Sequence, residues 1–269
     1  MSKTILITGC SSGIGKAAAL YFHSKGWNVA ATMRNPDLVD KIEDSANIIY
    51  PRLDVTDVSS IREATRTTID TFGRIDVLVN NAAYSLTGPF EAATAKQIEQ
   101  LYDVDVFGLM NVTREILPHF REMHSGMIIN ISSLGGRIGM PFSCFYASAK
   151  WAVEGFSEAL QYELSRVGVR MKIVEPGAIN TRFANNAIIV RKNDVPAYKE
   201  AMEKRLTGYE KRRDRLDDPM VVVKEIYRAV NDGKSKLRYI AGNDARLFWF
   251  LKNLLPEPVF TALLKRMAG

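Results

Sequence analysis

The segment "TILITGCSSGIG", residues 4–15, decides the fold, because an apolar run passes directly into a glycine-rich turn. The apolar run is short and uncharged, as expected of a strand that is covered on both faces. Gly9, Gly13 and Gly15 leave room where backbone must pass close to a pyrophosphate, and the N-terminus of the following helix offers N–H donors. Three residues separate the first two glycines, unlike in G-x-G-x-x-G. We interpret the segment as a dinucleotide-binding turn rather than a purely structural one.

Short apolar runs alternate with helical stretches along the whole chain. Gly26 is expected to close the first helix, whereas Asp57 and Thr94 are expected to cap the second and third. The alternation predicts a single α/β domain over 1–269, a Rossmann-type, doubly wound parallel sheet of about seven strands flanked by helices, with two small domains as the alternative. The expected strands are 4–8, 28–33, 47–54, 75–82, 127–133, 170–177 and 237–242.

Composition limits the classes of function. The 269 residues are 46% hydrophobic, and the net charge of +6 is spread over the chain, which disfavours a nucleic-acid partner and suits a polyanionic cofactor. Cys10 and Cys144 are too few for a disulfide framework, which favours a reducing compartment. The N-terminal apolar run is too short for a signal peptide, and no apolar run approaches the roughly 18 residues of a membrane span. We expect a soluble, cytoplasmic protein.

Two common kinds of active site are disfavoured. The three histidines, His23, His119 and His124, do not have a metal-ligand spacing, so no metal site is expected. A serine hydrolase is disfavoured because the chain has no G-x-S-x-G turn.

The stretch "FYASAK" places Tyr146 and Lys150 one helical turn apart on one face. The same spacing occurs in "YFHSK", with Tyr21 and Lys25, so spacing alone cannot identify an acid/base pair. Position along the chain separates the two pairs. Ser133 ends an expected strand thirteen residues before Tyr146, and ligands of open α/β sheets bind at the carboxyl ends of strands. We therefore expect the second pair to lie at the reactive end of the site.

The end of the second expected strand indicates which dinucleotide binds. NAD sites usually place an acid there for the ribose 2′-hydroxyl, whereas a 2′-phosphate needs a cation. This chain reads "AATMRN", with Met33 and Arg34 and no acid. NADP(H) is therefore favoured over NAD(H), the alternative being that Arg34 points into solvent.

Several motifs together resemble the short-chain dehydrogenase/reductase superfamily in its compact single-domain form. They occur in the family's order, and the last segments, "LRYIAG" and "LLPEPVF", are more loosely similar to the branch that holds 17β-hydroxysteroid dehydrogenase type 1 and the retinol dehydrogenases. The motifs are "TGCSSGIG", "LDV" at 53–55, "NNAA" at 80–83, the spacing of Ser133, Tyr146 and Lys150, and "PGAINT" at 176–181.

The resemblance implies a role for each matching residue. Tyr146 would exchange a proton with the substrate oxygen, Lys150 would favour the phenolate and hold the nicotinamide ribose, and Ser133 would hydrogen-bond the carbonyl. The remaining expected cofactor contacts are Gly9, Ser11, Ser12, Gly13, Ile14, Gly15, Arg34, Asp54, Val55, Asn81, Ala82, Pro176, Gly177, Ile179 and Thr181.

Two positions depart from the family pattern. Ala83 stands where glycine is usual, which adds one methyl group. Asp105 stands where an asparagine usually helps to hold a water behind the lysine. If the relay uses only the backbone carbonyl, aspartate can serve there; an ionised carboxylate cannot donate a hydrogen bond as an amide does. It could also attract Lys150 away from the tyrosine.

The leading hypothesis is an NADPH-dependent carbonyl reductase acting on an apolar ketone or aldehyde, steroid- or retinoid-like substrates included, or on the matching secondary alcohol in reverse. The segment 182–218 is expected to be a substrate loop or lid, the alternative being a solvated amphipathic helix. The expected substrate-side residues are Ser133, Tyr84, Met140, Phe142, Phe145 and Phe183.

Two other functions remain open. One is an NADP-binding protein whose catalysis is impaired by Asp105. The other, less favoured, is a nucleotide-sugar epimerase or dehydratase, which shares the tyrosine and lysine but has a larger C-terminal domain. By analogy with the family we expect a homodimer or homotetramer, and the apolar tail after residue 246 is expected to pack on the core or a second subunit.

Overall fold

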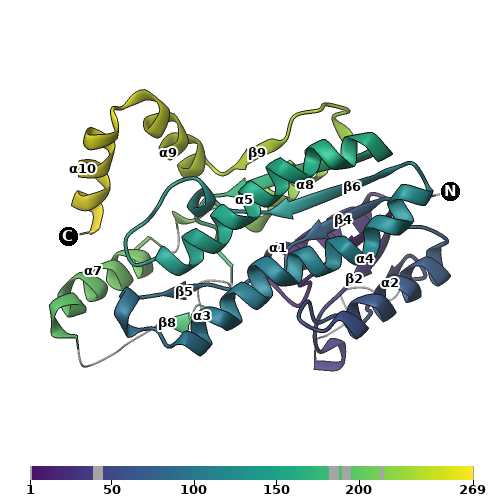
Figure 1. The fold of residues 1–269 in the computed structure, drawn as a ribbon, viewed down its shortest axis with the longest axis horizontal. Coiled ribbons are helices and arrows are strands. Elements are labelled where there is room, and N and C mark those ends of the chain that lie inside the picture. Colours follow the sequence, from purple (N-terminus) through teal and green to yellow (C-terminus); the bar gives the residue numbers. More distant parts are fainter. Residues whose placement is uncertain (1, 39–44, 182–187, 190–194, 213–214, 269) are drawn as a thin grey trace.

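A seven-stranded parallel sheet forms the centre of the computed structural model, which describes residues 2–38, 45–181, 188–189, 195–212 and 215–268 (Figure 1). The strand order is β3-β2-β1-β4-β6-β7-β9, so the chain starts in the middle and winds outward in both directions. This confirms the predicted fold class. The strands are β1 Thr4–Ile7, β2 Asn28–Ala31, β3 Ile48–Ile49, β4 Val77–Asn80, β6 Gly126–Ile131, β7 Val169–Pro176 and β9 Arg238–Ala241.

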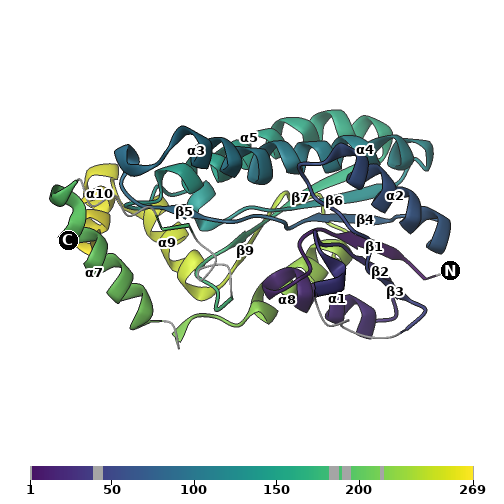
Figure 2. The same cartoon turned by 90° about the horizontal axis from the view of Figure 1, so that it is seen from below.

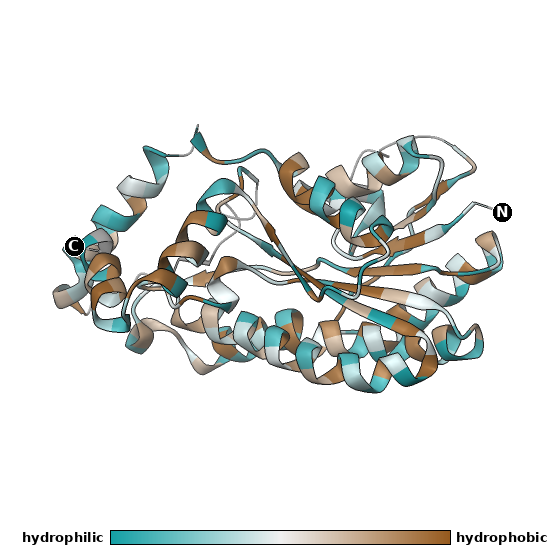
Figure 3. Ribbon diagram, turned by 90° about the horizontal axis from the view of Figure 1, so that it is seen from above, coloured by the Kyte–Doolittle hydropathy of each residue, from teal (hydrophilic) through white to brown (hydrophobic). Residues whose placement is uncertain are grey.

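Helices cover both faces of the sheet (Figure 2). Ile5 and Ile7 belong to the apolar cluster under α1 and α8, whereas Leu6 belongs to the cluster under α2 and α4, as the strand period of two requires. Figure 3 shows the consequence, with apolar strands between helices whose outer sides are polar. The helices are α1 Gly13–Ser24, α2 Val58–Phe72, α3 Ala95–Tyr102, α4 Leu109–Glu122, α5 Cys144–Leu164, α7 Lys199–Glu210, α8 Pro219–Asn231, α9 Asn243–Leu254 and α10 Glu257–Ala268.

The expected helix caps are present. The Asp57 carboxylate accepts hydrogen bonds from the first N–H groups of α2, and Thr94 forms a capping box with Gln97 at the start of α3. Gly26 follows the end of α1 with φ at +78°, a conformation that favours glycine. Local sequence signals therefore set these helix ends.

Several strand boundaries differ from the prediction by two or more residues, and two of these differences have a clear cause. Within the expected 47–54, β3 ends at Ile49 because Pro51 has no N–H with which to continue the ladder, and pairing resumes only as an isolated bridge between Arg52 and Met33. The strand expected to reach Ser133 ends at Ile131, because the Ser133 hydroxyl accepts a hydrogen bond from the Gly135 N–H and starts a 3₁₀ turn. Ser133 thereby leaves the sheet and lies just beyond its carboxyl edge.

Two features were not predicted from the sequence. A π-helical turn, Asp103–Gly108, separates α3 from α4. A second small sheet pairs β5, Leu86–Thr87, with β8, Ile188–Ile189. Within the expected lid, β8, a 3₁₀ turn at Pro196–Tyr198 and α7 are described, whereas Phe183 lies outside the described residues.

The C-terminal helices bury little of their apolar surface. Phe260 is buried, but Leu247, Phe250 and Leu254 on α9 are each more than half exposed. The expected packing of this tail on the core is thus limited to a few residues. In the described part of the chain, no helix is long and apolar enough to cross a membrane.

Candidate active site

A cleft of about 870 Å³ opens where the carboxyl ends of the central strands meet the loops that follow them. This is the position at which open parallel sheets bind ligands. Eighteen of the residues singled out in the sequence line it: Gly9, Ser11, Ser12, Gly13, Ile14, Arg34, Asp54, Val55, Asn81, Ala82, Tyr84, Ser133, Tyr146, Lys150, Pro176, Gly177, Ile179 and Thr181.

Other expected site residues do not line the cleft. Gly15 lies behind it, where a Cβ would collide with the Gly9 carbonyl and Asn81, so this glycine serves the packing of α1 on the sheet. Asp105 lies beneath the cleft wall. Met140 and Phe142 belong to the loop before α5, and the Phe142 ring meets Tyr198 edge-on.

The glycine-rich turn has the form that a pyrophosphate site needs. Gly9 has φ at +74°, and a Cβ there would lie 2.9 Å from the Ala82 Cα. The Asn81 amide donates to the carbonyls of Thr8 and Gly9 and so holds the turn. The Ser12 side chain does not cap α1, and the first turn of α1 has no acidic residue. Its N–H groups can thus receive an anion, so the chain fits a dinucleotide here.

Arg34 lies at the adenosine end of this cleft, beside Asp54 and Val55. Its side chain is exposed, and it forms no ion pair with the described residues, whereas Met33 next to it is buried. A guanidinium that no carboxylate occupies is suited to a ribose phosphate.

The reactive end joins Ser133, Tyr146 and Lys150. The Tyr146 hydroxyl is hydrogen-bonded to Ser133, and the Lys150 ammonium lies 5.6 Å from the centre of the Tyr146 ring. Lys150 is buried, and its Nζ also donates to the Ile131 carbonyl over 3.4 Å. A hydroxyl, a phenol and an ammonium therefore converge where a substrate oxygen could bind.

Asp105 meets Lys150 from the side away from the cleft. Its Oδ2 lies 3.2 Å from Lys150 Nζ as an ion pair, yet accepts no hydrogen bond from the described residues, and its Oδ1 accepts from the Tyr84 N–H over 3.0 Å. The expected attraction between Asp105 and the lysine is therefore present. Gly108 keeps the π-helical turn in place, because a Cβ there would lie 2.6 Å from Val55.

Burial and charge shift all three titratable groups. Burial raises the pKa of Asp105, and Lys150 and the Tyr84 N–H offset only part of this effect. Burial alone would lower the pKa of Lys150, but Asp105 and Tyr146 raise it overall. Burial also raises the pKa of Tyr146, which Lys150 and Ser133 oppose and Asp105 reinforces. The phenol is thus held protonated and the lysine charged.

The second tyrosine–lysine pair lies elsewhere. Tyr21 packs edge-on against Tyr227 of α8, and Lys25 Nζ lies 5.2 Å from the centre of the Tyr21 ring. Both residues are outside the cleft, so this pair serves helix packing. No group of three or more His, Cys, Asp or Glu side chains that could hold a metal occurs among the described residues.

Parts of the 182–218 segment reach the loops around the cleft. Arg205 of α7 donates to the Ser143 hydroxyl over 2.8 Å, just before the helix that carries Tyr146. Ile188 pairs with Leu86, two residues after the cleft residue Tyr84. The described parts of this segment therefore contact both loops on the substrate side.

Three polar residues in or near the site were not predicted from the sequence. Ser132 lines the cleft beside Ser133. Glu154 and Glu175 are buried just behind it. Charge alone did not mark the two glutamates, because Glu154 lies one turn from both Lys150 and Glu158, and Glu175 shares β7 with Arg170 and Lys172.

Comparison with known proteins agrees with this geometry. The sequence profile of the short chain dehydrogenase family matches residues 3–189. A 3-ketodihydrosphingosine reductase of Bacteroides thetaiotaomicron is 40% identical over 184 residues, which are 68% of this chain and 66% of that protein. The crystal structure of a short-chain dehydrogenase from Streptomyces avermitilis is 33% identical, with a TM-score of 0.80 over 100% of this chain and 98% of that one.

A further solved structure, ElxO with NADP bound, is 29% identical, with a TM-score of 0.73 over 89% of this chain and 98% of that one. The family match is consistent with the observed fold. It is also consistent with a cleft that brings Ser133, Tyr146 and Lys150 together. The chain therefore belongs to the short-chain dehydrogenase family of oxidoreductases.

Proposed function

We propose that this oxidoreductase is an NADPH-dependent carbonyl reductase for apolar ketones or aldehydes. The observation that carries the proposal is the convergence of Ser133, Tyr146 and Lys150 in a cleft that is also lined by the N-terminus of α1 and by Arg34, an arginine without an ion pair among the described residues. A nicotinamide cofactor, when bound, supplies the hydride.

The side chains supply the proton and hold the substrate. Ser133 donates a hydrogen bond to the carbonyl oxygen, and the Tyr146 phenol gives that oxygen a proton as negative charge develops on it. The resulting phenolate is stabilised by the Lys150 ammonium. Because the pKa of Tyr146 is raised, the phenol is protonated near neutral pH, which suits reduction better than alcohol oxidation.

The preference for NADPH is supported by Arg34. Its guanidinium can pair with a 2′-phosphate, and no acidic side chain of β2 competes for a 2′-hydroxyl. We expect Arg34→Ala to raise the KM for NADPH by about tenfold or more and to leave the KM for NADH nearly unchanged. Initial rates at varied cofactor concentration measure both values. An equal loss with both cofactors would contradict the preference.

The apolar substrate class is supported by two observations. Tyr84 and Ile179 line the same cleft as the catalytic residues, and a relative at 40% identity is named as a 3-ketodihydrosphingosine reductase. The test follows NADPH absorbance with long-chain ketones, aldehydes, retinoids and steroids. Turnover of at least one apolar carbonyl is expected. Tight NADPH binding without turnover of any carbonyl would contradict the proposal.

An impaired NADP-binding protein is the second candidate, and Asp105 is the observation that favours it. Its carboxylate lies against Lys150 and raises the pKa of Tyr146. Asp105→Asn discriminates the two functions. A reductase keeps the same order of turnover in both forms, whereas a protein silenced by Asp105 gains activity only as the asparagine variant.

A homodimer or homotetramer is part of the proposal. Trp151 and Tyr162 are 50% and 67% exposed on one side of α5, and Phe107 is 52% exposed on the neighbouring π-helical turn. Large exposed apolar side chains on adjoining elements support a subunit contact there. Light scattering after size exclusion measures the mass, and a monomer at micromolar concentration would contradict the assembly.

A further inference from the structure

Two buried glutamates behind the catalytic lysine have no role in the reaction described so far. Glu154 follows Lys150 by one turn on α5, and Glu175 lies on β7 directly before Pro176. Their exposed fractions are 4% and 3%. Burial of a carboxylate is costly unless its oxygens are paired, so both side chains need a physical account.

The two carboxyl groups share one arginine. Arg238 Nε lies 2.9 Å from Glu154 Oε2 and 3.4 Å from Glu175 Oε1, and Arg137 lies 3.0 Å from the same Glu175 oxygen. Two buried carboxylates on one N–H group repel each other. Burial, and then the charge of Glu154, raise the pKa of Glu175 to about 7. Glu175 therefore exchanges a proton near neutral pH.

Two buried oxygens, one on Glu154 and one on the neighbouring Ser132, lack a hydrogen-bond partner among the described residues. Glu154 Oε1 and Ser132 Oγ accept no hydrogen bond from the described residues, and Ser132 is 2% exposed. Both side chains approach Gly136, where a Cβ would lie 2.6 Å from Ser132 Oγ and 3.1 Å from Glu154 Cγ. Ser132 also lines the cleft that contains Lys150. Ser132, whose hydroxyl both accepts and donates, therefore borders the cleft and lies near Glu154 at Gly136.

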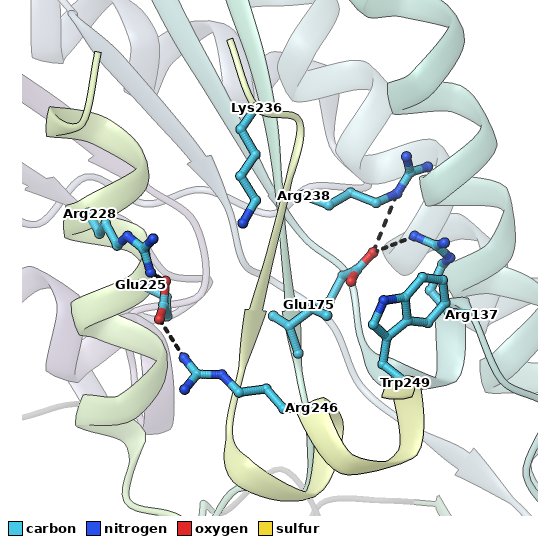
Figure 4. Close-up of a pocket in the computed structure, with 9 residues that line it drawn as sticks. Arg137, Glu175, Glu225, Arg228, Lys236, Arg238, Arg246 and Trp249 are labelled. Atoms are coloured by element: carbon cyan, nitrogen blue, oxygen red, sulfur yellow. Dashed lines mark hydrogen bonds and ion pairs between the residues drawn. The ribbon is translucent and has the colours of Figure 1, made fainter. Parts of the chain in front are cut away.

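A second cavity lies on the other side of the glutamate pair. It measures about 490 Å³ and is bounded by β9, α8, α9 and the loop after Ser133 (Figure 4). Glu175 lines it, and Figure 4 shows Arg137 and Arg238 converging on this carboxylate. The side chains of Arg228 and Arg246 on the opposite wall are more than half exposed, so the cavity opens to solvent.

The charged groups around the pair come from several elements. Arg137 and Arg238 contact it directly, and Lys150 and Glu158 face it from α5, whereas α8 and α9 present Glu225, Arg228 and Arg246 across the cavity. The arginines keep their charge, and the pKa of Lys150 is raised. Among these groups Glu175 is the one that exchanges a proton near pH 7.

We propose that Glu154 and Glu175 form a proton relay that connects the second cavity with Lys150 through the Ser132 hydroxyl. The relay rests on the proposed reductase function. Asp105 explains the need for it, because an ionised carboxylate behind Lys150 can accept a proton but cannot donate one. The two glutamates act through Lys150 and do not touch the substrate.

Every proton that the relay transfers is accounted for. Tyr146 gives its proton to the substrate oxygen and regains one from the Lys150 ammonium, which becomes an amine. The amine takes a proton that the glutamate pair passes on by way of the Ser132 hydroxyl; because Ser132 Oγ has no hydrogen-bond partner among the described residues, water completes the link on both sides. Water in the second cavity then returns one proton to the pair. One solvent proton is thus consumed for each carbonyl reduced, and alcohol oxidation runs the relay in reverse.

Kinetics of four variants test the relay. Glu154→Gln, Glu175→Gln and Ser132→Ala are each expected to lower kcat of carbonyl reduction by roughly tenfold, with KM unchanged, and to remove the limb of the pH–kcat profile near pH 7. Glu225→Gln is the matched control, since it changes a carboxylate of the same cavity that does not contact Glu154. It should leave kcat and the pH profile unchanged. Wild-type pH profiles in both relay glutamine variants would overturn the proposal.

Infrared spectroscopy tests the proton on Glu175 without turnover. The wild-type protein should show a protonated-carboxyl stretching band at pH 6 that titrates near pH 7. The band should vanish in Glu175→Gln and persist in Ser132→Ala. Its absence from the wild type would overturn the relay. If the wild-type protein shows the band but reduces no carbonyl, the proposed function is contradicted. The protonated carboxyl group itself would still be supported.

Discussion

Two lysine–aspartate pairs, each with a buried lysine, differ in how many of their polar atoms have hydrogen-bond partners. Lys172 Nζ lies 2.8 Å from Asp232 Oδ1 and donates to the Tyr239 hydroxyl, which in turn donates to Asp232 Oδ2 over 2.7 Å. Lys150 Nζ lies 3.2 Å from Asp105 Oδ2, an oxygen that accepts no hydrogen bond from the described residues. We call the first network closed, because both Asp232 oxygens have hydrogen-bond partners. We call the second open, because Asp105 Oδ2 accepts no hydrogen bond from the described residues.

The pKa values of the two aspartates move in opposite directions. Burial would raise the pKa of Asp232, but hydrogen bonds from Lys172, from the Lys234 N–H and from Tyr239 hold it well below its usual range. For Asp105 burial prevails, and its pKa is raised. The closed network stabilises the fold, whereas the open one leaves its lysine available to the active site.

The largest expected difference comes from replacing each lysine with methionine. Lys172→Met leaves Asp232 without its cation and should lower the free energy of unfolding by about 3 kcal/mol, with kcat unchanged in the folded fraction. Lys150→Met should lower kcat of carbonyl reduction by about 10²-fold or more. Its effect on stability should be smaller, because Asp105 can take up a proton. Urea unfolding and initial rates check both variants. Equal stability losses would contradict the comparison.

Replacing each aspartate with asparagine should give opposite pH dependences of stability. The lowered pKa of Asp232 stabilises the fold above pH 3.8 and is lost as pH falls, so Asp232→Asn should be less stable by about 2 kcal/mol at pH 7 and approach the wild type in acid. The raised pKa of Asp105 has the reverse effect: wild-type stability falls as pH rises above 3.8, and Asp105→Asn lacks this decline. Denaturant midpoints between pH 3 and 8 measure both curves, and parallel curves would contradict this account.

Asp105→Asn should also change the pH dependence of catalysis. The carboxylate contributes to the raised pKa of Tyr146, so its removal should shift the limb for alcohol oxidation, which needs the phenolate, to lower pH. Asp103→Asn is the matched control, because Asp103 lines the cleft on the same turn without contacting Lys150. If the limb is unshifted in Asp105→Asn, then Asp105 does not affect the pKa of Tyr146.

The smallest expected effect is that of Tyr239→Phe. The hydroxyl closes the structural network, so its loss should cost about 1–2 kcal/mol of unfolding free energy and leave the pH–rate profile unchanged. Tyr146→Phe is the counterpart in the open network and should leave stability nearly unchanged. Thermal unfolding of the two variants compares them directly. A larger stability loss from Tyr146→Phe would reverse the assignment of the two networks.

Patterns within short stretches of sequence were sufficient for the fold. The apolar runs and the caps Asp57 and Thr94 are determined by neighbouring residues, and the structure has each of them. Strand ends were less predictable, because Ser133 leaves the sheet through a hydrogen bond of its own side chain. The pairing of β5 with β8 joins residues about one hundred positions apart, which no local pattern records.

The site was predictable where chemistry follows spacing along one helix or one turn, as for Tyr146, Lys150 and Gly9. The site was not predictable where its contacts join residues on different strands and helices. The contacts of Glu154 and Glu175 with Arg238 depend on the order of β7 and β9 and on the depth of α5. Met140 and Phe142 were expected in the pocket because they flank the motif, but the turn at Phe142 carries that ring toward Tyr198.

Comparison of the two tyrosine–lysine pairs in one assay tests the central claim most directly. NADPH oxidation with an apolar ketone is measured for the wild type, Tyr146→Phe and Tyr21→Phe, with NADPH binding measured separately. We expect Tyr146→Phe to lose at least about 10²-fold in kcat while it still binds NADPH, and Tyr21→Phe to match the wild type. Wild-type turnover by Tyr146→Phe would contradict the assignment of Tyr146 as the proton donor.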